Sequence, residues 1–167
     1  LVRSPENLFE LYLTSVGRGS TLLLNIPPDR RGLFHENDVA SLRGFRKILD
    51  SVFAENLAEK ATATATPVRG DKPIYAADKV LDGDAETYWA TNDGVTTGSL
   101  ELSWDAPQTL NYISLQEYIK LGQRVAAFTV SVWEDGAWKE VQNQTTIGHK
   151  RILKLNGVET SKLKIEI

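Results

Sequence analysis

The chain of 167 residues contains no cysteine and no methionine. The absence of cysteine excludes disulfide bonds and thiolate metal sites, but it does not fix the compartment, because many exported bacterial proteins also have none. No apolar run approaches the roughly 18 residues that a membrane-spanning helix needs, and no signal peptide is visible. Because the sequence starts at Leu1 and has no methionine, we expect its true N-terminus to lie upstream.

The chain also has little net charge. Its 22 acidic residues exceed its 19 basic residues by three, and it has no cluster of lysine and arginine. This balance argues against a nucleic acid or an anionic membrane as partner. The hydrophobic share of 41% and the charged share of 25% are typical of a globular protein. The length suffices for one ordinary domain or for parts of two.

Residues 1–60 predict two helices with one buried strand between them. The first helix begins at Ser4, which is followed by proline and glutamate, as is typical of a capped first turn. The unbroken apolar run 21–26, stopped by two prolines, is typical of a parallel strand buried on both faces. The second helix begins at about Asn37 and keeps apolar residues at three-to-four spacing.

One strand between two helices is not a complete domain, because a buried strand needs neighbouring strands to take its backbone hydrogen bonds. Residues 1–60 supply no such neighbour, so we infer that they are the last elements of a larger α/β sheet or (β/α) barrel. Ligand sites in these folds lie at the carboxyl ends of the strands, so we expect Asn25 to border a pocket. A solvent-facing loop at residues 21–26 would contradict this interpretation.

From residue 61 the pattern changes to short alternating strands. An Ala-Thr alternation leads into a loop with proline and glycine, which predicts a boundary near residue 60. Asp135-Gly136 is a strong hairpin signal. Many strands with no helix between them indicate an antiparallel β-sandwich over residues 61–167, and because the chain ends inside a strand pattern we expect a closing strand beyond it. The predicted strands are Ser99–Trp104, Tyr112–Glu117, Ala127–Glu134, Ala137–Gln142, Arg151–Leu155 and Leu163–Ile167. The residues expected to face the core are Leu100, Leu102, Ile113, Leu115, Phe128, Val130, Val132, Trp138, Ile152, Leu163 and Ile165, with Trp89 as an anchor beneath the loop that precedes it.

Residues 79–89 carry the most distinctive pattern, two aspartates around a glycine followed by threonine and two aromatic residues. Gly83 allows a positive φ, so the carboxylates of Asp82 and Asp84 can converge with the oxygens of Thr87 and nearby backbone carbonyls. A hard cation such as calcium, with six to eight oxygen ligands at about 2.3–2.6 Å, suits such a cluster. Asp-Gly-Asp is also ordinary turn chemistry. The spacing alone therefore leaves both a plain turn and a metal loop open.

Both halves of the chain resemble known protein families. Residues 22–33, followed by 35–39 and a helix, resemble the last strand and helix of the catalytic barrel in glycoside hydrolase family 29 α-L-fucosidases. Residues 61–167 resemble the coagulation-factor type C, or discoidin-like, galactose-binding sandwich that follows the barrel in many of these enzymes. The stretches that carry the second resemblance are Lys79–Trp89, Gly122–Val125, Gly136–Trp138 and Thr146–Arg151.

The resemblance implies an exo-acting enzyme that removes terminal α-linked L-fucose from glycans with retention, using an aspartate nucleophile and a glutamate acid/base. Both catalytic motifs of the family precede the matched stretches, so no catalytic residue is assigned to this chain and no cofactor is expected for catalysis. The expected partners are a fucosylated oligosaccharide and the remainder of the barrel upstream of Leu1, and the expected location is periplasmic or secreted. The alternative is a non-catalytic glycan-binding or adhesion protein with a discoidin-like module.

The resemblance also bears on the loop around Gly83. In discoidin-like sandwiches this spacing often surrounds a structural calcium or sodium ion. The implied ligands are the carbonyl of Lys79, the carboxylate of Asp82, chiefly the carbonyl of Asp84, and the carbonyl and hydroxyl of Thr87. The family's last ligands come from a final strand beyond this sequence.

The segment 116–124 places an acid, an amide and a guanidinium around a glycine. One hypothesis is that Glu117, Gln123 and Arg124 contact sugar hydroxyls or the rim of the barrel, since arginine and carboxylates hydrogen-bond hydroxyls well. The alternative is a local pair between Glu117 and Arg124 that stiffens the loop. Elsewhere, solvated turn and helix-start carboxylates are expected at Asp29, Glu36 and Asp38, and structural histidines at His35 and His149.

Overall fold

The computed structural model describes residues 2–167. The chain divides into two compact units, one ending at Asn56 and one running from Leu57 to Ile167. Among the residues described, no helix combines the length and the apolar character needed to cross a membrane.

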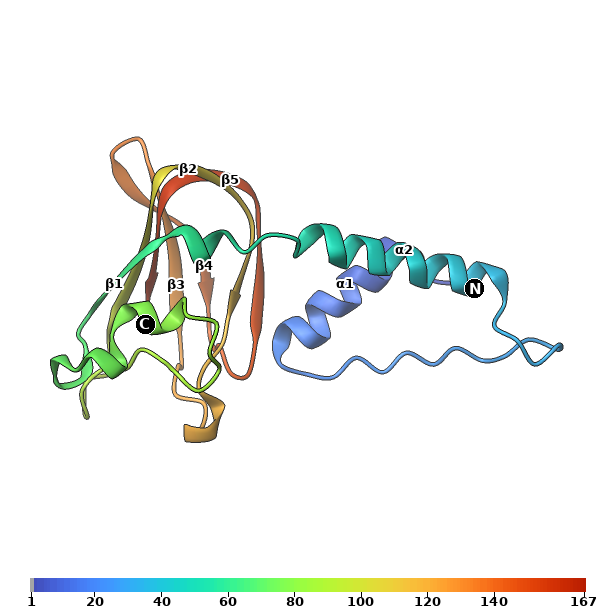
Figure 1. The fold of residues 1–167 in the computed structure, drawn as a ribbon, viewed down its shortest axis with the longest axis horizontal. Helices are drawn as coiled ribbons and strands as arrows, with labels where there is room; N and C mark the ends of the chain where they lie inside the picture. Colours follow the sequence, from blue (N-terminus) through green and yellow to red (C-terminus); the bar gives the residue numbers. More distant parts are fainter. Residues whose placement is uncertain (1) are drawn as a thin grey trace. The chain divides into compact units, whose positions relative to one another are not determined.

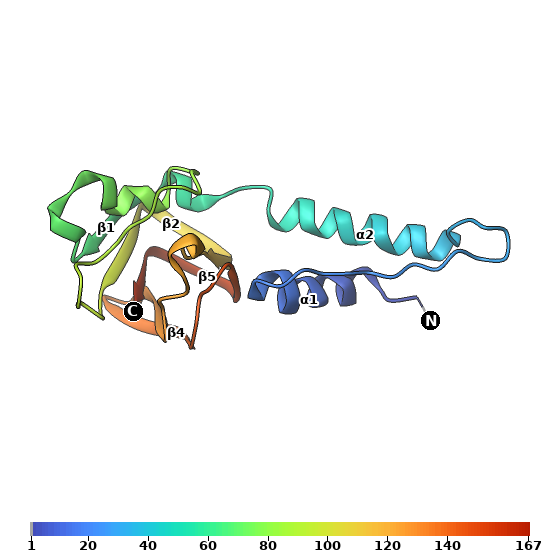
Figure 2. The ribbon, with the colours of Figure 1, turned by 90° about the horizontal axis from the view of Figure 1, so that it is seen from below.

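The first unit contains two packed helices, seen side by side in Figures 1 and 2. Ser4 caps the first helix, because its hydroxyl accepts a hydrogen bond from a first-turn amide at 3.2 Å. His35 caps the second helix in the same way through Nδ1. Aromatic rings fill the space between the helices, with the Tyr12 and Phe45 centroids 6.2 Å apart. The elements are α1 (Pro5–Ser15), the 3₁₀ turn η1 (Val16–Arg18) and α2 (Glu36–Val52), and both predicted helix starts are confirmed.

The strand predicted at residues 21–26 is absent from the described chain, and that prediction is wrong for this structure. The segment runs alone between α1 and α2 (Figure 1), and its backbone makes no hydrogen bond among residues 2–167. Leu23 is 90% exposed, and Asn25 is also exposed. The physical reason is the lack of neighbouring strands. A strand exists only through hydrogen bonds to neighbours, and residues 2–56 contain no strand with which the run could pair.

The second unit is an antiparallel β-sandwich, as predicted. Its strands pair in the order β1-β2-β5-β3-β4, and every pairing is antiparallel. The Ala-Thr alternation, used above only to mark a boundary, forms the edge strand β1. The strands are β1 (Thr62–Thr66), β2 (Ser99–Leu115), β3 (Phe128–Glu134), β4 (Ala137–Gln144) and β5 (Arg151–Glu166).

Two long, bent strands make the two layers. The sequence predicted four short strands where the structure has β2 and β5, which pair along most of their length. Their register shifts between Ser103 and Gln108 and again between Leu110 and Tyr112. Such irregularities bend a strand, and Figure 1 shows β2 and β5 arching together so that each strand contributes to both layers.

The core lies between these layers. Val130 and Val132 of β3 are 0% and 1% exposed, and their partners on β5 are also buried. Trp138 was predicted to face inward, but its ring lies against Trp133, with centroids 5.2 Å apart, and under the ammonium of Lys164 at 4.9 Å. Trp133 alternates with the core valines of β3 and therefore points to the face opposite the core. Trp138 pairs with Trp133 across the strands, so it lies on the same outer face and is only half-buried.

The loops gather at one end of the sandwich, at the bottom of Figure 1. We call this end, formed by residues 67–98, 116–127 and 145–150, the loop end. Hydrogen bonds and ring contacts link these three segments, as described next. All five exposed large hydrophobic residues described in the second unit belong to it: Ile74, Val80, Val95, Ile119 and Leu121.

Candidate functional site

The four predicted metal ligands converge at the loop end. The 3₁₀ turn η5 (Ala77–Val80) presents the Lys79 carbonyl, and Gly83, with φ of 74°, turns the chain back. Thr87 Oγ1 then lies 2.8 Å from both carboxylate oxygens of Asp82 and 3.1 Å from the Asp84 carbonyl. The Lys79 carbonyl is 3.3 Å from the same hydroxyl. We call residues 79–87 the oxygen loop.

The chemistry of these donors fits a hard cation. Thr87 Oγ1 has one proton, so it can donate fully to only one of the four oxygens around it, and the others keep unused lone pairs. The Asp82 pKa is lowered by the hydrogen bond from the Asp84 amide and then by that from Thr87, so Asp82 is ionised at neutral pH. No group of three or more His, Cys, Asp or Glu side chains that could hold a metal occurs among residues 2–167. A cation here would therefore depend on carbonyl and hydroxyl oxygens besides Asp82.

The same loop also contains ordinary turn bonds. Asp82 Oδ1 accepts from the Asp84 amide at 3.0 Å, and Asp84 Oδ1 accepts from the Glu86 amide at 2.9 Å. The Lys79 ammonium lies 3.7 Å from Asp82 Oδ2. The hydrogen bonds of a plain turn and the converging oxygens that a metal loop needs are present together. The Asx bonds bring the carbonyls and the carboxylate to one place.

A row of three tyrosine rings crosses the loop end beside the oxygen loop. Tyr88 stacks on Tyr118 with centroids 4.6 Å apart and planes 16° apart, and Tyr75 lies 5.7 Å from Tyr88 on the other side of the row. A cation lies at each end, Arg69 at 5.9 Å from the Tyr75 centroid and Lys120 at 5.8 Å from the Tyr118 centroid. We call these five residues the tyrosine row.

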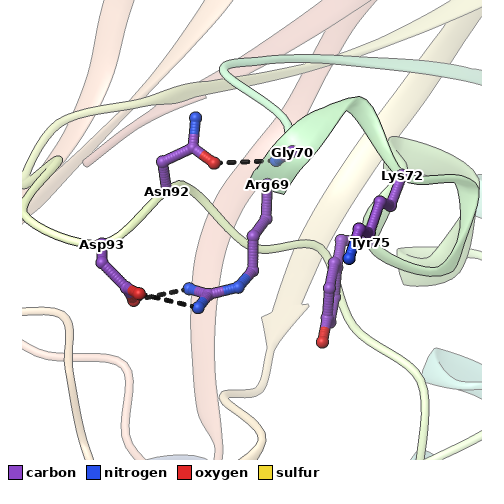
Figure 3. A pocket seen from close by; sticks show the side chains of 6 residues that line it. All are labelled: Arg69, Gly70, Lys72, Tyr75, Asn92 and Asp93. Carbon is purple, nitrogen blue, oxygen red and sulfur yellow. Dashed lines mark hydrogen bonds and ion pairs between the residues drawn. The ribbon is translucent and has the colours of Figure 1, made fainter.

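Each end of the tyrosine row is fixed by a carboxylate. Arg69 makes a two-point contact with Asp93 at 2.7 and 2.9 Å, which Figure 3 shows beside Tyr75. Glu86 accepts from the Lys120 ammonium at 2.5 Å and from the Tyr118 hydroxyl at 3.0 Å. These bonds lower the pKa of Asp93, through Arg69, and of Glu86, chiefly through Lys120.

A shallow depression of about 370 Å³ adjoins the Arg69 end of the row. Asn92 Oδ1 accepts from the Gly70 amide at 2.7 Å and so holds its two walls together. Sequence reasoning missed this site. Its residues come from two loops with no regular spacing between them, so no pattern along the chain could have identified it. The lining residues, all drawn in Figure 3, are Arg69, Gly70, Lys72, Tyr75, Asn92 and Asp93.

Glu117 was grouped with Gln123 and Arg124, and the structure separates their roles. The Glu117 carboxylate accepts three backbone hydrogen bonds, from Arg124 at 2.6 Å, Val125 at 2.9 Å and Gly148 at 2.5 Å. The Arg124 guanidinium instead donates to the Leu121 carbonyl at 2.9 Å. The proposed side-chain pair is therefore wrong in detail, because Glu117 binds the backbone of Arg124. Glu117 fixes its own loop, whereas Arg124 remains on the surface.

The remaining sequence predictions concern single residues. Trp89 packs against the core and donates from Nε1 to the Pro67 carbonyl at 2.9 Å, so its predicted anchoring role is confirmed. Asp29 and Glu36 both bind Arg31, at 2.6 and 2.8 Å, in the turn before α2. His35 serves as the cap of α2, which is a structural role.

Comparison with known proteins gives matches over the whole chain. Residues 60–167 match the family described as the F5/8 type C domain. The chain is 35% identical over 167 residues to a protein of Oryza sativa subsp. japonica named putative alpha-L-fucosidase 1, covering 99% of this chain and 32% of that protein. The chain thus spans about a third of the length of the curated relatives it matches.

Solved structures match equally far. The crystal structure of SpGH29 superposes with a TM-score of 0.91 at 39% identity, covering 99% of this chain and 36% of that one. A GH29 fucosidase of Ruminococcus gnavus in complex with fucose gives a TM-score of 0.91 at 30% identity, covering 98% and 33%. These matches confirm the resemblance drawn from the sequence, and they include the helical unit as well as the sandwich.

Proposed function

This chain belongs to the F5/8 type C domain family through residues 60–167, and from that premise we propose that it is the C-terminal part of an exo-acting, retaining α-L-fucosidase. The observation that carries the proposal is the extent of the matches. A shared sandwich alone would align only the second unit, whereas the fucosidase matches extend over 99% of the chain. A non-catalytic glycan-binding protein with a discoidin-like module is the alternative, and nothing in the first unit favours it.

In this proposal the first unit completes a (β/α) barrel. The apolar run 21–26 would pair with strands from the upstream part of the protein. This pairing would cover Leu23 and bring Asn25 to the border of a pocket. The exposed loop at residues 21–26 does not by itself support this reading; its support is that the matched fucosidases align over 99% of this chain and are about three times as long. The catalytic aspartate and glutamate would lie in that upstream part, about 5–5.5 Å apart as retention requires.

The substrate class would be a glycan that ends in α-linked L-fucose, and the enzyme would act in the periplasm or outside the cell. The test is release of the aryl group from an aryl α-L-fucoside by the complete protein, with residues 1–167 alone as the inactive control. Release only by the complete protein supports the proposal. Binding of a fucosylated oligosaccharide without turnover would establish the glycan-binding alternative instead.

A structural calcium ion is the second part of the proposal. The carbonyls of Lys79 and Asp84, the Asp82 carboxylate and the oxygens of Thr87 would hold it, with water or residues of a strand after Ile167 completing the shell. The ion would neutralise the converging oxygens and hold the loop closed; it would take no part in bond cleavage. Calcium should raise the melting temperature of the wild type, because a ligand that binds only the folded state stabilises it.

Two variants, each with one aspartate replaced by asparagine, test the site: one aspartate lies inside the oxygen cluster and the other lies outside it. Asp82→Asn should remove the calcium response, since the charged ligand is lost. Asp78→Asn should keep it, because that carboxylate is 70% exposed in the same turn and outside the cluster. Equal melting temperatures in calcium and in EDTA for the wild type would refute the ion.

Of the three residues of segment 116–124 expected to contact sugar hydroxyls or the barrel rim, Gln123 and Arg124 remain candidates. Glu117 is already occupied by three backbone amides, whereas the other two side chains lie on the surface. Arg124→Ala should weaken binding of a fucosylated oligosaccharide or lower turnover in the complete protein, since a guanidinium hydrogen-bonds hydroxyls well. Unchanged affinity together with unchanged turnover would remove this role.

A further inference from the structure

Two residues next to Thr87 reach across the loop end and hold another segment. Glu86 precedes the threonine and binds the Tyr118 hydroxyl at 3.0 Å and the Lys120 ammonium at 2.5 Å. Tyr88 follows the threonine and stacks on the Tyr118 ring at 4.6 Å. The oxygen loop and the turn around Tyr118 are therefore joined on both sides of one proposed cation ligand.

Among residues 2–167, the tip of the segment that receives these contacts is otherwise held only by local bonds, such as that from the Arg124 guanidinium to the Leu121 carbonyl at 2.9 Å. Its 3₁₀ turn η6 spans Ile119–Leu121, and these two residues are 43% and 51% exposed. Glu117 fixes the base of the segment through backbone amides, whereas Tyr118 and Lys120 join its tip to the other loop. A surface turn with few buried contacts opens at low free energy, so contacts made from outside it have a large effect on its position.

We propose that occupancy of the oxygen loop by a cation is coupled to the conformation of residues 116–124, with Glu86 and Tyr88 as the connecting side chains. The proposal rests on the calcium site proposed above and adds a consequence for it. Holding Thr87 at the ion fixes the backbone on which Glu86 and Tyr88 are carried, because adjacent Cα atoms are only about 3.8 Å apart. The tip of the segment then keeps one position, and with it the exposed Arg124.

The coupling extends along the tyrosine row. The ring of Tyr88 also lies beside that of Tyr75, with centroids 5.7 Å apart. The Tyr75 ring in turn lies beside the guanidinium of Arg69, which lines the depression. A change in the oxygen loop thus reaches both surfaces that flank it. Coupling of this kind is reciprocal in free energy. Loss of the contacts at Tyr118 must therefore weaken cation binding, even though neither Tyr118 nor Lys120 is a ligand.

The test measures amide hydrogen exchange of the full chain in calcium chloride and in EDTA. In the wild type, calcium should slow exchange in residues 79–87 and also in residues 116–124. Glu86→Gln and Tyr118→Phe should keep the protection of residues 79–87 at saturating calcium and lose part of it in residues 116–124, because the ring stack with Tyr88 remains. Each variant should also bind calcium with an affinity lowered about fivefold or more by calorimetry, the range typical of coupled sites.

Glu134→Gln is the matched control. Glu134 is also an exposed glutamate bound to a lysine, at 2.6 Å in the β3–β4 hairpin, but it has no contact with the oxygen loop. It should bind calcium as the wild type does and show the wild-type exchange pattern. A general effect of losing one surface ion pair would appear in this variant too and would overturn the proposal.

The remaining outcomes separate the coupling from the site. Protection of residues 79–87 without any protection of residues 116–124 would overturn the coupling and leave the calcium site standing. Unchanged calcium affinity in both Glu86→Gln and Tyr118→Phe would do the same. No calcium effect on any segment would remove the site and the coupling together.

Discussion

Tyr88 and Tyr118 stack nearly parallel, 4.6 Å apart, although they belong to different loops of the sandwich. The stack joins the loop that gathers four oxygen donors to the segment that exposes Arg124. Stacked rings at this distance contribute beyond the area that they bury. The loop end is therefore one connected surface, although its parts come from three stretches of the chain.

Replacement of Tyr118 should separate the two contributions of its side chain. Tyr118→Phe keeps the ring stack and loses the bond from the hydroxyl to Glu86, so we expect only a small fall in melting temperature. Tyr118→Leu loses both, and the fall should be larger, roughly 2–6 °C. Differential scanning calorimetry measures the order of the two variants. The reverse order would show that the ring stack contributes nothing.

Glu117→Gln should destabilise the sandwich by about 1–3 kcal/mol. The carboxylate uses both oxygens to accept three backbone hydrogen bonds. Glutamine has one acceptor oxygen, so its amide nitrogen would face at least one donor that then loses its partner. Urea unfolding measures the difference, with Glu140→Gln on the exposed side of β4 as control. A value for Glu117→Gln no larger than that of the control would contradict the structural role.

Phe128→Ala should cost about 3–5 kcal/mol, because it opens a cavity in the core. Phe128 is 2% exposed, whereas Ile119, the control, is 43% exposed. Ile119→Ala should stay within about 0.5 kcal/mol of the wild type. All four tryptophans lie in the second unit, so tryptophan fluorescence in urea reports on the sandwich alone. Similar losses for the two variants would show that the core is placed wrongly.

Asp93 should make stability depend on pH in the acid range. The Arg69 guanidinium lowers the pKa of Asp93 in the folded chain below its ordinary value of 3.8. The folded state then binds fewer protons than the unfolded chain between the two values. The stabilisation is complete above 3.8 and is lost as the pH falls through the folded-state pKa.

Asp93→Asn removes this titrating group. The melting temperature of the variant should therefore fall less steeply than that of the wild type as the pH is lowered from about 6 to about 2. Thermal denaturation across this range measures both slopes. Parallel curves for the two proteins would show that the contact between Arg69 and Asp93 does not form in solution.

Features that depend on neighbouring residues could be predicted from the sequence alone. The cap at Ser4 needs only a side chain near the first-turn amides, and the hairpin at Asp135-Gly136 needs only two residues that tolerate a positive φ, found at 51° and 80°. The alternation that buries Val130 and Val132 follows from the period of a strand. The oxygen donors of residues 79–87 could also be predicted from the sequence, because one turn brings them together.

Contacts between distant segments could not be predicted from the sequence. The run 21–26 has the composition of a buried strand, but composition cannot supply the neighbours that a strand requires. Trp138 alternates correctly for either face, and only its pairing with Trp133 places it outward. The partner of Glu117 is a set of backbone amides, and no sequence pattern marks which amides a fold leaves without partners.

The sequence by itself thus determined the helix starts, the alternation of the strands and the oxygen donors of the loop, because each depends on residues within a few positions of one another. The tertiary structure alone decided the tyrosine row, the depression beside Arg69 and the backbone role of Glu117. These features form where separate loops meet, and the meeting is set by the bends of β2 and β5 and by the packing of the core, which no single stretch of sequence contains.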